Sequence, residues 1–371
     1  MEKELNTEKQ ERRKINNEDI RFTNIKVIGV GGGGCNAVNR LVQDGVKGVD
    51  FIAINTDTQA LLTLPDKVYK LNIGKNTTKG LGAGSDTELG RRAAEESIEE
   101  IRKVINGADM VFITAGLGGG TGTGAIPLIA SISKEMGILT IAIVTKPFSF
   151  EGKIRRIIAE EGLNNLKPNV DAMIIIPNDK LLSIAEETTT LIDSFKLADS
   201  VIKHGVVGIT EIILKPGLIN IDFADIQSIL KDSGSCWMGI GTAKGENRAE
   251  EAALKAIDSP LLEMKVEGAK RVLFNVMGGN DLTLVEINKA SNIIYQAVDP
   301  DAKIILGATI DENLKDEVKV ILIATEFPEN AFQRDSRKES IFSFSEVKKS
   351  ISLDMEDLPP LTRRRKILFT E

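Results

Sequence analysis

The chain has 371 residues, 42% of them apolar and 27% charged, with 33 glycines and 11 prolines, a composition typical of a globular protein long enough for two domains. A formal net charge of −7 argues against nucleic acid as the main partner, because phosphate backbones attract basic surfaces. The two cysteines lack metal-ligand spacing, and no apolar run approaches the roughly 20 residues of a membrane span, so we expect a cytoplasmic protein without a direct membrane span.

Residues 1–20 are charged and lack the apolar core of a signal peptide, so we expect a disordered N-terminal arm. Beyond them, short apolar runs alternate with amphipathic stretches. The apolar runs predict strands at 25–30, 49–57, 67–73, 109–115, 139–145 and 171–177. Helical spacing predicts helices that include 35–46, 88–107 and 125–137. This alternation favours the α/β class, with a doubly wound, Rossmann-like parallel sheet in a first domain at 21–190.

A long helix is predicted at 191–215, ending where Lys215 is followed by proline and glycine. The pattern beyond it predicts a second, α+β domain over 216–327. Its strands are expected at 235–243, 271–279, 302–310 and 317–327, and its helices at 247–259 and 283–297. Residues 328–352 are polar and aperiodic, as in a flexible linker, and 353–371 form a distinct C-terminal peptide with two prolines and a basic run.

Two glycine-rich stretches each follow a predicted strand of the first domain. Residues 29–34 read GVGGGG, and six of the nine residues at 116–124 are glycine. Glycine weakens a fold unless the main chain needs close approach or positive φ. Loops after two strands of a parallel sheet lie at one edge, and the amides of the helices that follow can bind anions. We therefore expect a polyphosphate held from two sides, with the Thr121 and Thr123 hydroxyls as further donors.

A dinucleotide site is the main alternative that these residues leave open. Gly29, Gly31 and Gly34 fit the G-x-G-x-x-G pattern, and Asp57 follows at about the distance of a ribose-binding acid. Alone, this fingerprint would favour an NAD-dependent oxidoreductase. The second glycine stretch favours the polyphosphate site instead, since a dehydrogenase holds its pyrophosphate on one glycine turn. Tight turning alone would explain one such loop but hardly both.

Several further segments occur in order and with the expected gaps over about 24–327: GVGGGGCNAVN, NTD, GLGAG, GGGTGTGA, TKPFSFEGKIRR, IPNDKLL and GLINIDFAD. In these the chain resembles the FtsZ family of bacterial division GTPases, in the tubulin superfamily. The resemblance implies binding of GTP and GDP, GTP hydrolysis, head-to-tail polymerisation into protofilaments and a ring at the mid-cell division site. It also implies Mg²⁺ held by the nucleotide phosphates rather than by protein ligands. A tubulin-like filament protein outside division, as in plasmid partitioning, is an alternative.

The resemblance assigns nucleotide contacts to individual residues. Those at the phosphates are Gly32, Gly33, Gly34, Cys35, Asn36, Gly120, Thr121 and Gly122. Ribose and nucleotide contacts fall on Glu151 and Arg155, which have the spacing of an ordinary surface ion pair. The base stacks on Phe195, Asp199 one helical turn later accepts from the guanine N–H groups, and Asn178 makes a further base contact.

Cys35 and the segment at residues 84–87 depart from the family pattern. A helix N-terminus could lower the pKa of the Cys35 thiol, although a quiet small residue is the simpler interpretation. Ser85, Asp86 and Thr87 stand where the family usually has Asn-Pro, and the Asp86 charge would repel a nearby γ-phosphate.

A second set of polar residues, Asn220, Asp222 and Asp225, lies in GLINIDFAD. Two aspartates three residues apart can face one way on a helix, and on their own they resemble an ordinary acidic helix N-terminus. The family resemblance makes the three residues catalytic and places them at the opposite pole from the nucleotide. One subunit then completes the site of the next, and assembly activates hydrolysis. The tail sequence EDLPPLTRRR resembles the peptide that binds membrane-tethering division proteins such as FtsA.

Overall fold

The computed structural model describes residues 23–182, 190–215, 217–258 and 266–328. The predicted N-terminal arm, the linker beyond residue 328 and the C-terminal peptide lie outside the described residues. Within the described part no helix is both long and apolar enough to cross a bilayer.

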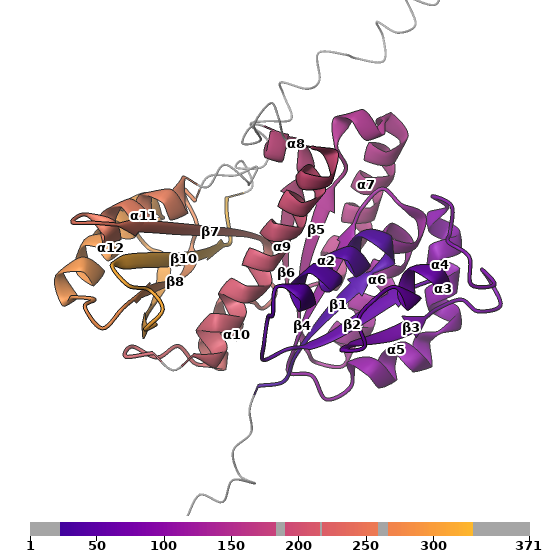
Figure 1. Cartoon of the computed structure of the whole chain (residues 1–371), viewed down its shortest axis with the longest axis horizontal. Coiled ribbons are helices and arrows are strands. Elements are labelled where there is room, and N and C mark those ends of the chain that lie inside the picture. Colours follow the sequence, from indigo (N-terminus) through magenta and orange to yellow (C-terminus); the bar gives the residue numbers. More distant parts are fainter. Residues whose placement is uncertain (1–22, 183–189, 216, 259–265, 329–371) are drawn as a thin grey trace, which may run out of the picture. The chain divides into compact units, whose positions relative to one another are not determined.

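A parallel sheet forms the first half of the fold, in the order β3-β2-β1-β4-β5-β6. Its strands are β1 (Ile25–Val30), β2 (Asp50–Asn55), β3 (Val68–Asn72), β4 (Met110–Gly116), β5 (Leu139–Lys146) and β6 (Ala172–Pro177). The strands are apolar along nearly their whole length because helices cover both faces. The predicted doubly wound sheet is confirmed (Figure 1).

The helices of this half divide between the two faces of the sheet. They are α2 (Gly31–Gln43), α3 (Thr58–Leu62), α4 (Thr87–Glu96), α5 (Ile98–Ile105), α6 (Gly120–Glu135), α7 (Lys153–Leu166) and α8 (Asn178–Leu182), with two short 3-10 helices, η2 (Ser149–Glu151) and η3 (Lys167–Asn169). Apolar side chains of α2 pack on one face, against the same core as the long helix described below. Those of α4, α5, α6 and α7 pack on the other face.

The helix predicted at 88–107 is in fact two helices, α4 and α5, which meet at Ser97. The backbone of Ser97 leaves the helical conformation at φ −115° and ψ 21°. Its buried hydroxyl accepts a hydrogen bond from the Gly74 amide at 3.1 Å. The break therefore depends on a contact with a distant loop, which the local sequence pattern does not contain.

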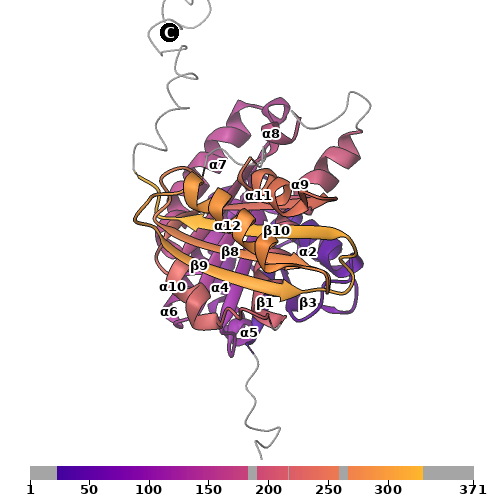
Figure 2. The same ribbon diagram turned by 90° about the vertical axis from the view of Figure 1, so that its left-hand side faces the viewer.

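A second sheet follows the long helix α9 (Leu191–Leu214) and the short helix α10 (Phe223–Leu230). Its strands are β7 (Gly234–Lys244), β8 (Arg271–Gly278), β9 (Lys303–Ile310) and β10 (Glu317–Thr325), in the order β7-β10-β8-β9. The helices α11 (Arg248–Ile257) and α12 (Leu284–Ala297) cover one face of this sheet (Figure 2). The predicted long helix and α+β half are confirmed.

β7 joins the two sheets into one. Its first residues pair with β6, Ala172 with Gly234 and Met173 with Ser235, and its remaining length pairs with β10. Helix α9 buries apolar residues in a core shared by both sheets, to which β4, β5 and β10 contribute. The described residues from 23 to 327 pack as one compact unit. The predicted boundaries at 190 and 216 therefore divide two sheets that share a core. The proposed boundaries themselves stay predictions.

Candidate nucleotide site

The two glycine-rich stretches contact each other at the C-terminal edge of the parallel sheet. They follow β1 and β4, which are neighbours in the sheet, and this is the point where the strand order reverses direction. Gly31 has φ +69°, and a Cβ on it would lie 2.6 Å from the Gly122 amide nitrogen. A Cβ on Gly33 would lie 3.1 Å from the Gly116 nitrogen. Only glycine allows both the backbone conformation and this approach, so the two loops form one main-chain surface.

The helices that begin at these loops have free N-terminal amides. Neither α2 nor α6 has a side-chain cap or an acidic residue in its first turn. Aspartate or threonine side chains cap α3, α4, α9, α10 and α12, whereas α5, α7 and α11 also lack a side-chain cap, so it is the convergence of α2 and α6 that sets them apart. Uncapped amides and two helix dipoles that converge on the same edge favour an anionic ligand. Of the predicted phosphate contacts, Gly32, Gly33 and Asn36 are exposed, whereas Gly34, Gly120, Thr121 and Gly122 are buried.

The threonine hydroxyls of the second glycine stretch are engaged within the protein. The Thr121 Oγ1 lies 2.7 Å from the Oγ1 of Thr56, in a buried contact. The Thr123 Oγ1 accepts a hydrogen bond from the Gly118 amide at 2.9 Å. Both hydroxyls thus help to hold the loop, and the Thr123 hydroxyl, which accepts here, keeps its own O–H as a donor. Thr56, which the sequence interpretation passed over, is part of this arrangement.

Cys35 is a packing residue. Its side chain is buried, with Sγ 4.0 Å from the carbonyl oxygens of Gly29 and Ile54. Burial, with a smaller contribution from the Asp57 charge, raises the pKa of the thiol to about 12. Loss of solvent outweighs the helix N-terminus, which agrees with the simpler interpretation of Cys35 as a quiet small residue. Asp57 itself caps α3 by accepting from the amides of Gln59 and Ala60.

The unusual segment at residues 84–87 lies against the second glycine loop. A Cβ on Gly120 would approach the Asp86 amide nitrogen and carbonyl oxygen to 2.8 Å. Asp86 caps α4, since its carboxylate accepts from the Leu89 amide at 3.0 Å. The negative charge of Asp86, which was expected to repel a γ-phosphate, is therefore bonded to the Leu89 amide in the first turn of α4. Ser85 has φ +70°, a strained conformation for a residue with a side chain.

An aromatic wall is formed by Phe195 on α9 and by Phe148. The Phe195 side chain is 42% exposed, and its ring meets the buried ring of Phe148 edge-on at 5.5 Å between centroids. Phe150 stacks on the same Phe148 ring at 4.9 Å. Phe148 therefore orients Phe195, whose exposed surface is free to stack on a planar ligand. Sequence reasoning missed Phe148, although it stands in the quoted motif TKPFSF.

Two polar groups beside this wall have unused hydrogen-bonding capacity. Asn178, the first residue of α8, is buried, and its Oδ1 has no hydrogen-bond partner among the described residues. Asp199 on α9 has no hydrogen-bond partner in the described part of the chain either. Burial raises the pKa of Asp199 to about 6, and the charge of Arg40 on α2 opposes that rise. The Asn178 oxygen is buried and the Asp199 carboxylate is half-buried, so both acceptors would gain from hydrogen bonds with the N–H groups of a ligand.

Glu151 and Arg155 form the ion pair that their spacing predicts. The Glu151 carboxylate also accepts from the Phe148 amide at 2.9 Å and closes η2. The pair thus supports the turn that holds Phe148 and Phe150, and the side chain of Arg155 is 49% exposed.

The acidic residues of the second set cap a helix. Asp222 accepts from the Asp225 amide at 2.8 Å, and Asp225 accepts from the Asp222 amide at 3.1 Å. This reciprocal bonding starts α10 and fixes both carboxylates at the surface. Asn220 accepts from the Gly217 amide at 3.3 Å.

Helix α9 separates the acidic residues from the base pocket. Asp199 and Leu214 are fifteen residues apart on one continuous helix, which corresponds to about 22 Å. Asn220, Asp222 and Asp225 follow beyond that far end (Figure 1). They therefore do not belong to the nucleotide site formed by the glycine loops of the same chain.

Among the described residues no three histidine, cysteine or carboxylate side chains gather in a way that could hold a metal ion. The glycine loops contribute amides rather than metal ligands.

Comparison with known proteins identifies the family. Residues 24–186 match the GTPase domain of the Tubulin/FtsZ family, and residues 234–328 match the C-terminal domain of the FtsZ family. An empty FtsZ dimer from M. jannaschii is 45% identical, with 88% of this chain and 92% of that chain covered and a TM-score of 0.76. A single-residue mutant of M. jannaschii FtsZ has the same identity and TM-score, with 88% and 95% covered. CetZ1 from Haloferax volcanii, bound to GDP, shares the fold at 22% identity and a TM-score of 0.72, with 83% and 95% covered. The chain therefore belongs to the FtsZ family, within the Tubulin/FtsZ group of GTPases.

Proposed function

We propose that this chain is a cytoskeletal GTPase that binds GTP across the two glycine loops and the Phe195 pocket. The observation that carries the proposal is the convergence of two uncapped helices, together with the Asp199 carboxylate and the Asn178 Oδ1, which have no hydrogen-bond partner among the described residues. The amides bind phosphate, and the Asp199 carboxylate accepts from the ring N–H and amino group of guanine. Adenine has an acceptor in place of that ring N–H, so it would be rejected. A nicotinamide dinucleotide would have no use for the second loop.

We further propose that subunits assemble head to tail and that hydrolysis is completed in trans. The helical separation of about 22 Å between Asp199 and Leu214 supports this. One of the similar structures is described as an FtsZ dimer, and a structural relative of the same fold is described as a CetZ2 protofilament. A docked neighbour would present its Asp222 and Asp225 to the γ-phosphate. A contact between two unlike surfaces that does not close propagates as a filament.

The chemistry proposed for the acidic turn is the activation of water. Capping uses one oxygen of Asp222 and one of Asp225, so each carboxylate has a second oxygen for a water molecule. That water is oriented and deprotonated as its oxygen bonds to the γ-phosphorus, the bond to the β–γ bridging oxygen breaks, and GDP leaves. The Asn220 amide can help to hold the water. Mg²⁺ bound to the phosphates would neutralise their charge.

The substitution Asp222→Ala tests this assignment. We expect normal GTP binding, because the residue lies far from its own glycine loops, and a GTPase rate lower by roughly 10²–10⁴-fold. In mixtures the variant should slow wild-type subunits more than simple dilution does, because it leaves its neighbour's site incomplete. Equilibrium GTP binding and phosphate release would be measured on the same samples. Loss of GTP binding in the variant would contradict the in-trans role.

We propose a division role for the filament, with assembly into a ring at mid-cell in the cytoplasm. The tail motif at 353–371 supports this role by its resemblance to the tether-binding peptide, and it would recruit a membrane tether of the FtsA type. The structural likeness to CetZ proteins shows only the fold, so a filament outside division is the competing proposal.

A further inference from the structure

The acidic turn is attached to the C-terminal sheet on its N-terminal side. Lys215, at the end of α9, donates to the Asp311 carboxylate at 2.7 Å, and Asp311 directly follows β9. This contact and the hydrogen bonds from Asn313 lower the pKa of Asp311 to about 2, so the ion pair persists at neutral pH. Further along, the backbones of Ile219 and Ala308 exchange two hydrogen bonds, at 3.2 and 3.1 Å. The chain is thus fixed to β9 immediately before Asn220.

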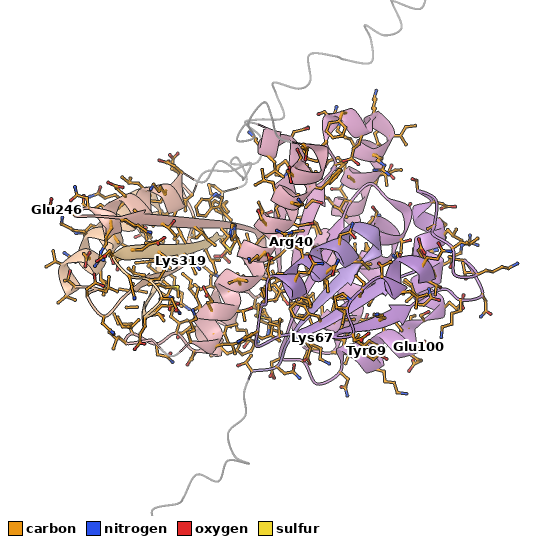
Figure 3. The ribbon with its side chains drawn as sticks, viewed as in Figure 1. Arg40, Lys67, Tyr69, Glu100, Glu246 and Lys319 are labelled. Carbon is orange, nitrogen blue, oxygen red and sulfur yellow. The ribbon has the colours of Figure 1, made fainter. Side chains whose placement is uncertain are left out.

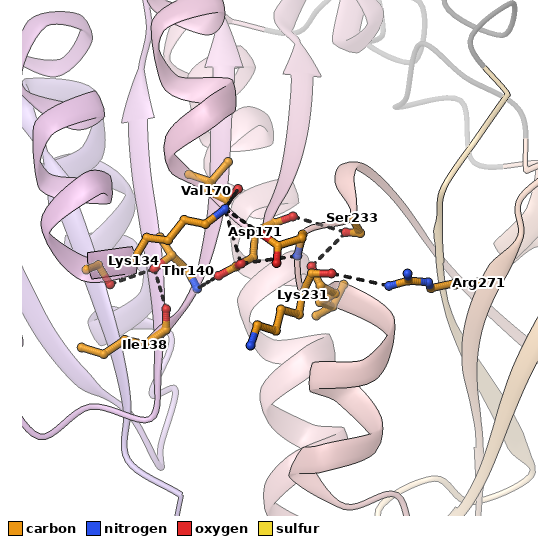
Figure 4. Close-up of polar contacts among 11 residues, drawn as sticks. Lys134, Ile138, Thr140, Val170, Asp171, Lys231, Ser233 and Arg271 are labelled. Carbon is orange, nitrogen blue, oxygen red and sulfur yellow. Dashed lines mark hydrogen bonds and ion pairs between the residues drawn. The ribbon is translucent and has the colours of Figure 1, made fainter. Parts of the chain in front are cut away.

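The same sheet holds the chain after the acidic turn. Arg271 on β8 donates to the carbonyl oxygens of Ser228 at 3.2 Å and Lys231 at 3.5 Å, which end α10 (Figure 4). Lys303 on β9 donates to the Ser228 hydroxyl at 3.0 Å. A cation at the last carbonyls of a helix also complements its dipole.

Polar contacts from the parallel sheet reach the chain after α10. The buried Asp171 at the start of β6 accepts from the Asp232 amide at 3.3 Å, and Lys134 on α6 pairs with the Asp232 carboxylate at 2.8 Å. Figure 4 shows these contacts grouped around Asp171, while Arg271 approaches from the other sheet. Asp232 and Gly234 both have positive φ, 51° and 71°. The chain therefore turns at Asp232–Gly234, between the end of α10, which contacts the C-terminal sheet, and β7, which pairs with the parallel sheet.

We propose that Lys215 and Arg271 are positioning residues for GTP hydrolysis, because they fix both ends of the acidic segment to the C-terminal sheet. When that sheet docks on a neighbouring subunit, Asp222 and Asp225 reach the neighbour's γ-phosphate in a preset orientation. The inference rests on the proposed in-trans function. Rigid placement matters because a displacement of about 1 Å at a reacting group can cost up to roughly 10² in rate.

The test compares Lys215→Met, Arg271→Met and the double variant in the full chain. The rate is measured at saturating GTP and divided by the amount of assembled protein, which sedimentation quantifies. We expect this kcat to fall about 3- to 10-fold in each single variant. KM and the GTP affinity of the monomer should stay unchanged, because neither residue contacts the glycine loops or the base pocket. Lys215→Arg should restore most of the rate, since it keeps a cation opposite Asp311.

Lys289→Met is the matched control. Lys289 on α12 pairs with Glu250 on α11 at 2.6 Å, in the same half of the fold but without contact to the acidic segment. Its kcat should equal that of the wild type. Figure 3 labels Glu246 and Lys319, two other charged residues in the half of the fold that carries Lys289.

The outcomes separate this inference from the function on which it rests. The positioning role alone would be overturned if kcat were unchanged in Lys215→Met and Arg271→Met while Asp222→Ala hydrolysed GTP slowly in the same assay. Normal turnover in Asp222→Ala would overturn the in-trans function itself. If Lys215→Met and Arg271→Met lose GTP affinity together with kcat, the positioning role is contradicted. An equal fall of kcat in the control Lys289→Met would contradict it as well. If Arg271→Met does not fold, Lys215→Met and its arginine rescue decide the matter.

Discussion

At the scale of single residues, Asp199 is an acid whose pKa is raised in the folded protein, so that its ionised form is disfavoured. Its pKa is raised to about 6 from an ordinary value of 3.8, mainly by burial. The folded state therefore binds more protons than the unfolded chain between these two values, and this group lowers stability as pH rises through that window. The proposed ligand would reverse this balance, because the guanine N–H groups would donate to the ionised carboxylate of Asp199.

GTP affinity should accordingly fall as pH drops below about 6. At pH 5 only about one molecule in eleven would have Asp199 ionised, so binding should be roughly tenfold weaker than at pH 7. The measurement is GTP binding to the monomer below the assembly threshold. Because nucleotide phosphates titrate in the same range, the decisive quantity is the difference between wild type and Asp199→Asn. Equal pH slopes in the two proteins would contradict the assignment.

Other residues show where sequence reasoning reaches its limit. The directions of the Thr121 hydroxyl and the Cys35 thiol depend on partners that are distant in sequence. Thr56 lies 65 positions from Thr121, and the Cys35 thiol contacts the Ile54 carbonyl from another strand. Residue types could therefore predict a phosphate-binding backbone, but not which side chains turn inward.

At the scale of elements, the contact between the two glycine loops makes a stability test possible. Gly31→Ala should destabilise the protein by about 2 kcal/mol or more, because Gly31 has φ +69° and its Cβ would collide with Gly122. Gly32 is the matched control, with ordinary φ and no atom within 4 Å of its Cβ. Urea unfolding of both variants would measure the difference.

The two substitutions should differ in function as well. Gly32→Ala should keep or slightly raise the free energy of unfolding, since alanine favours helix over glycine. It should nevertheless weaken GTP binding, because Gly32 is exposed in the first loop and the added methyl group would occupy open space proposed for the phosphates. Unweakened binding in a stable Gly32→Ala protein would count against close phosphate approach at this position.

The elements themselves were largely predictable, and the reason is burial. Apolar runs bounded by charge placed β1 at 25–30, the same residues that the structure shows. Two features depended on long-range contacts instead. The pairing of Ala172 with Gly234 joins the sheets, and Ser97 divides one predicted helix in two. Local periodicity carries no information about either contact.

At the scale of the whole molecule, the C-terminal peptide at 353–371 lies outside the described residues, and its role is a proposal. Deleting 353–371 should leave GTP turnover and filament formation unchanged, because the glycine loops, the Phe195 pocket and the acidic turn all lie within 24–327. The same deletion should abolish ring attachment at the membrane. Phosphate release, sedimentation and imaging of labelled protein in cells would test the three statements. Intact rings without the peptide would refute its docking role.

The length of α9 has a consequence for any filament built from this chain. The helix carries the proposed base contacts Phe195 and Asp199 near one end and leads to the acidic turn at the other, so a linear head-to-tail polymer would have two chemically different tips. If Asp222 and Asp225 act across each contact between subunits, the terminal subunit whose nucleotide site is uncovered retains its γ-phosphate, because no neighbour supplies these carboxylates. At the opposite tip the carboxylates have no substrate to attack. Growth and decay of the polymer would then have a built-in direction, set by one continuous helix.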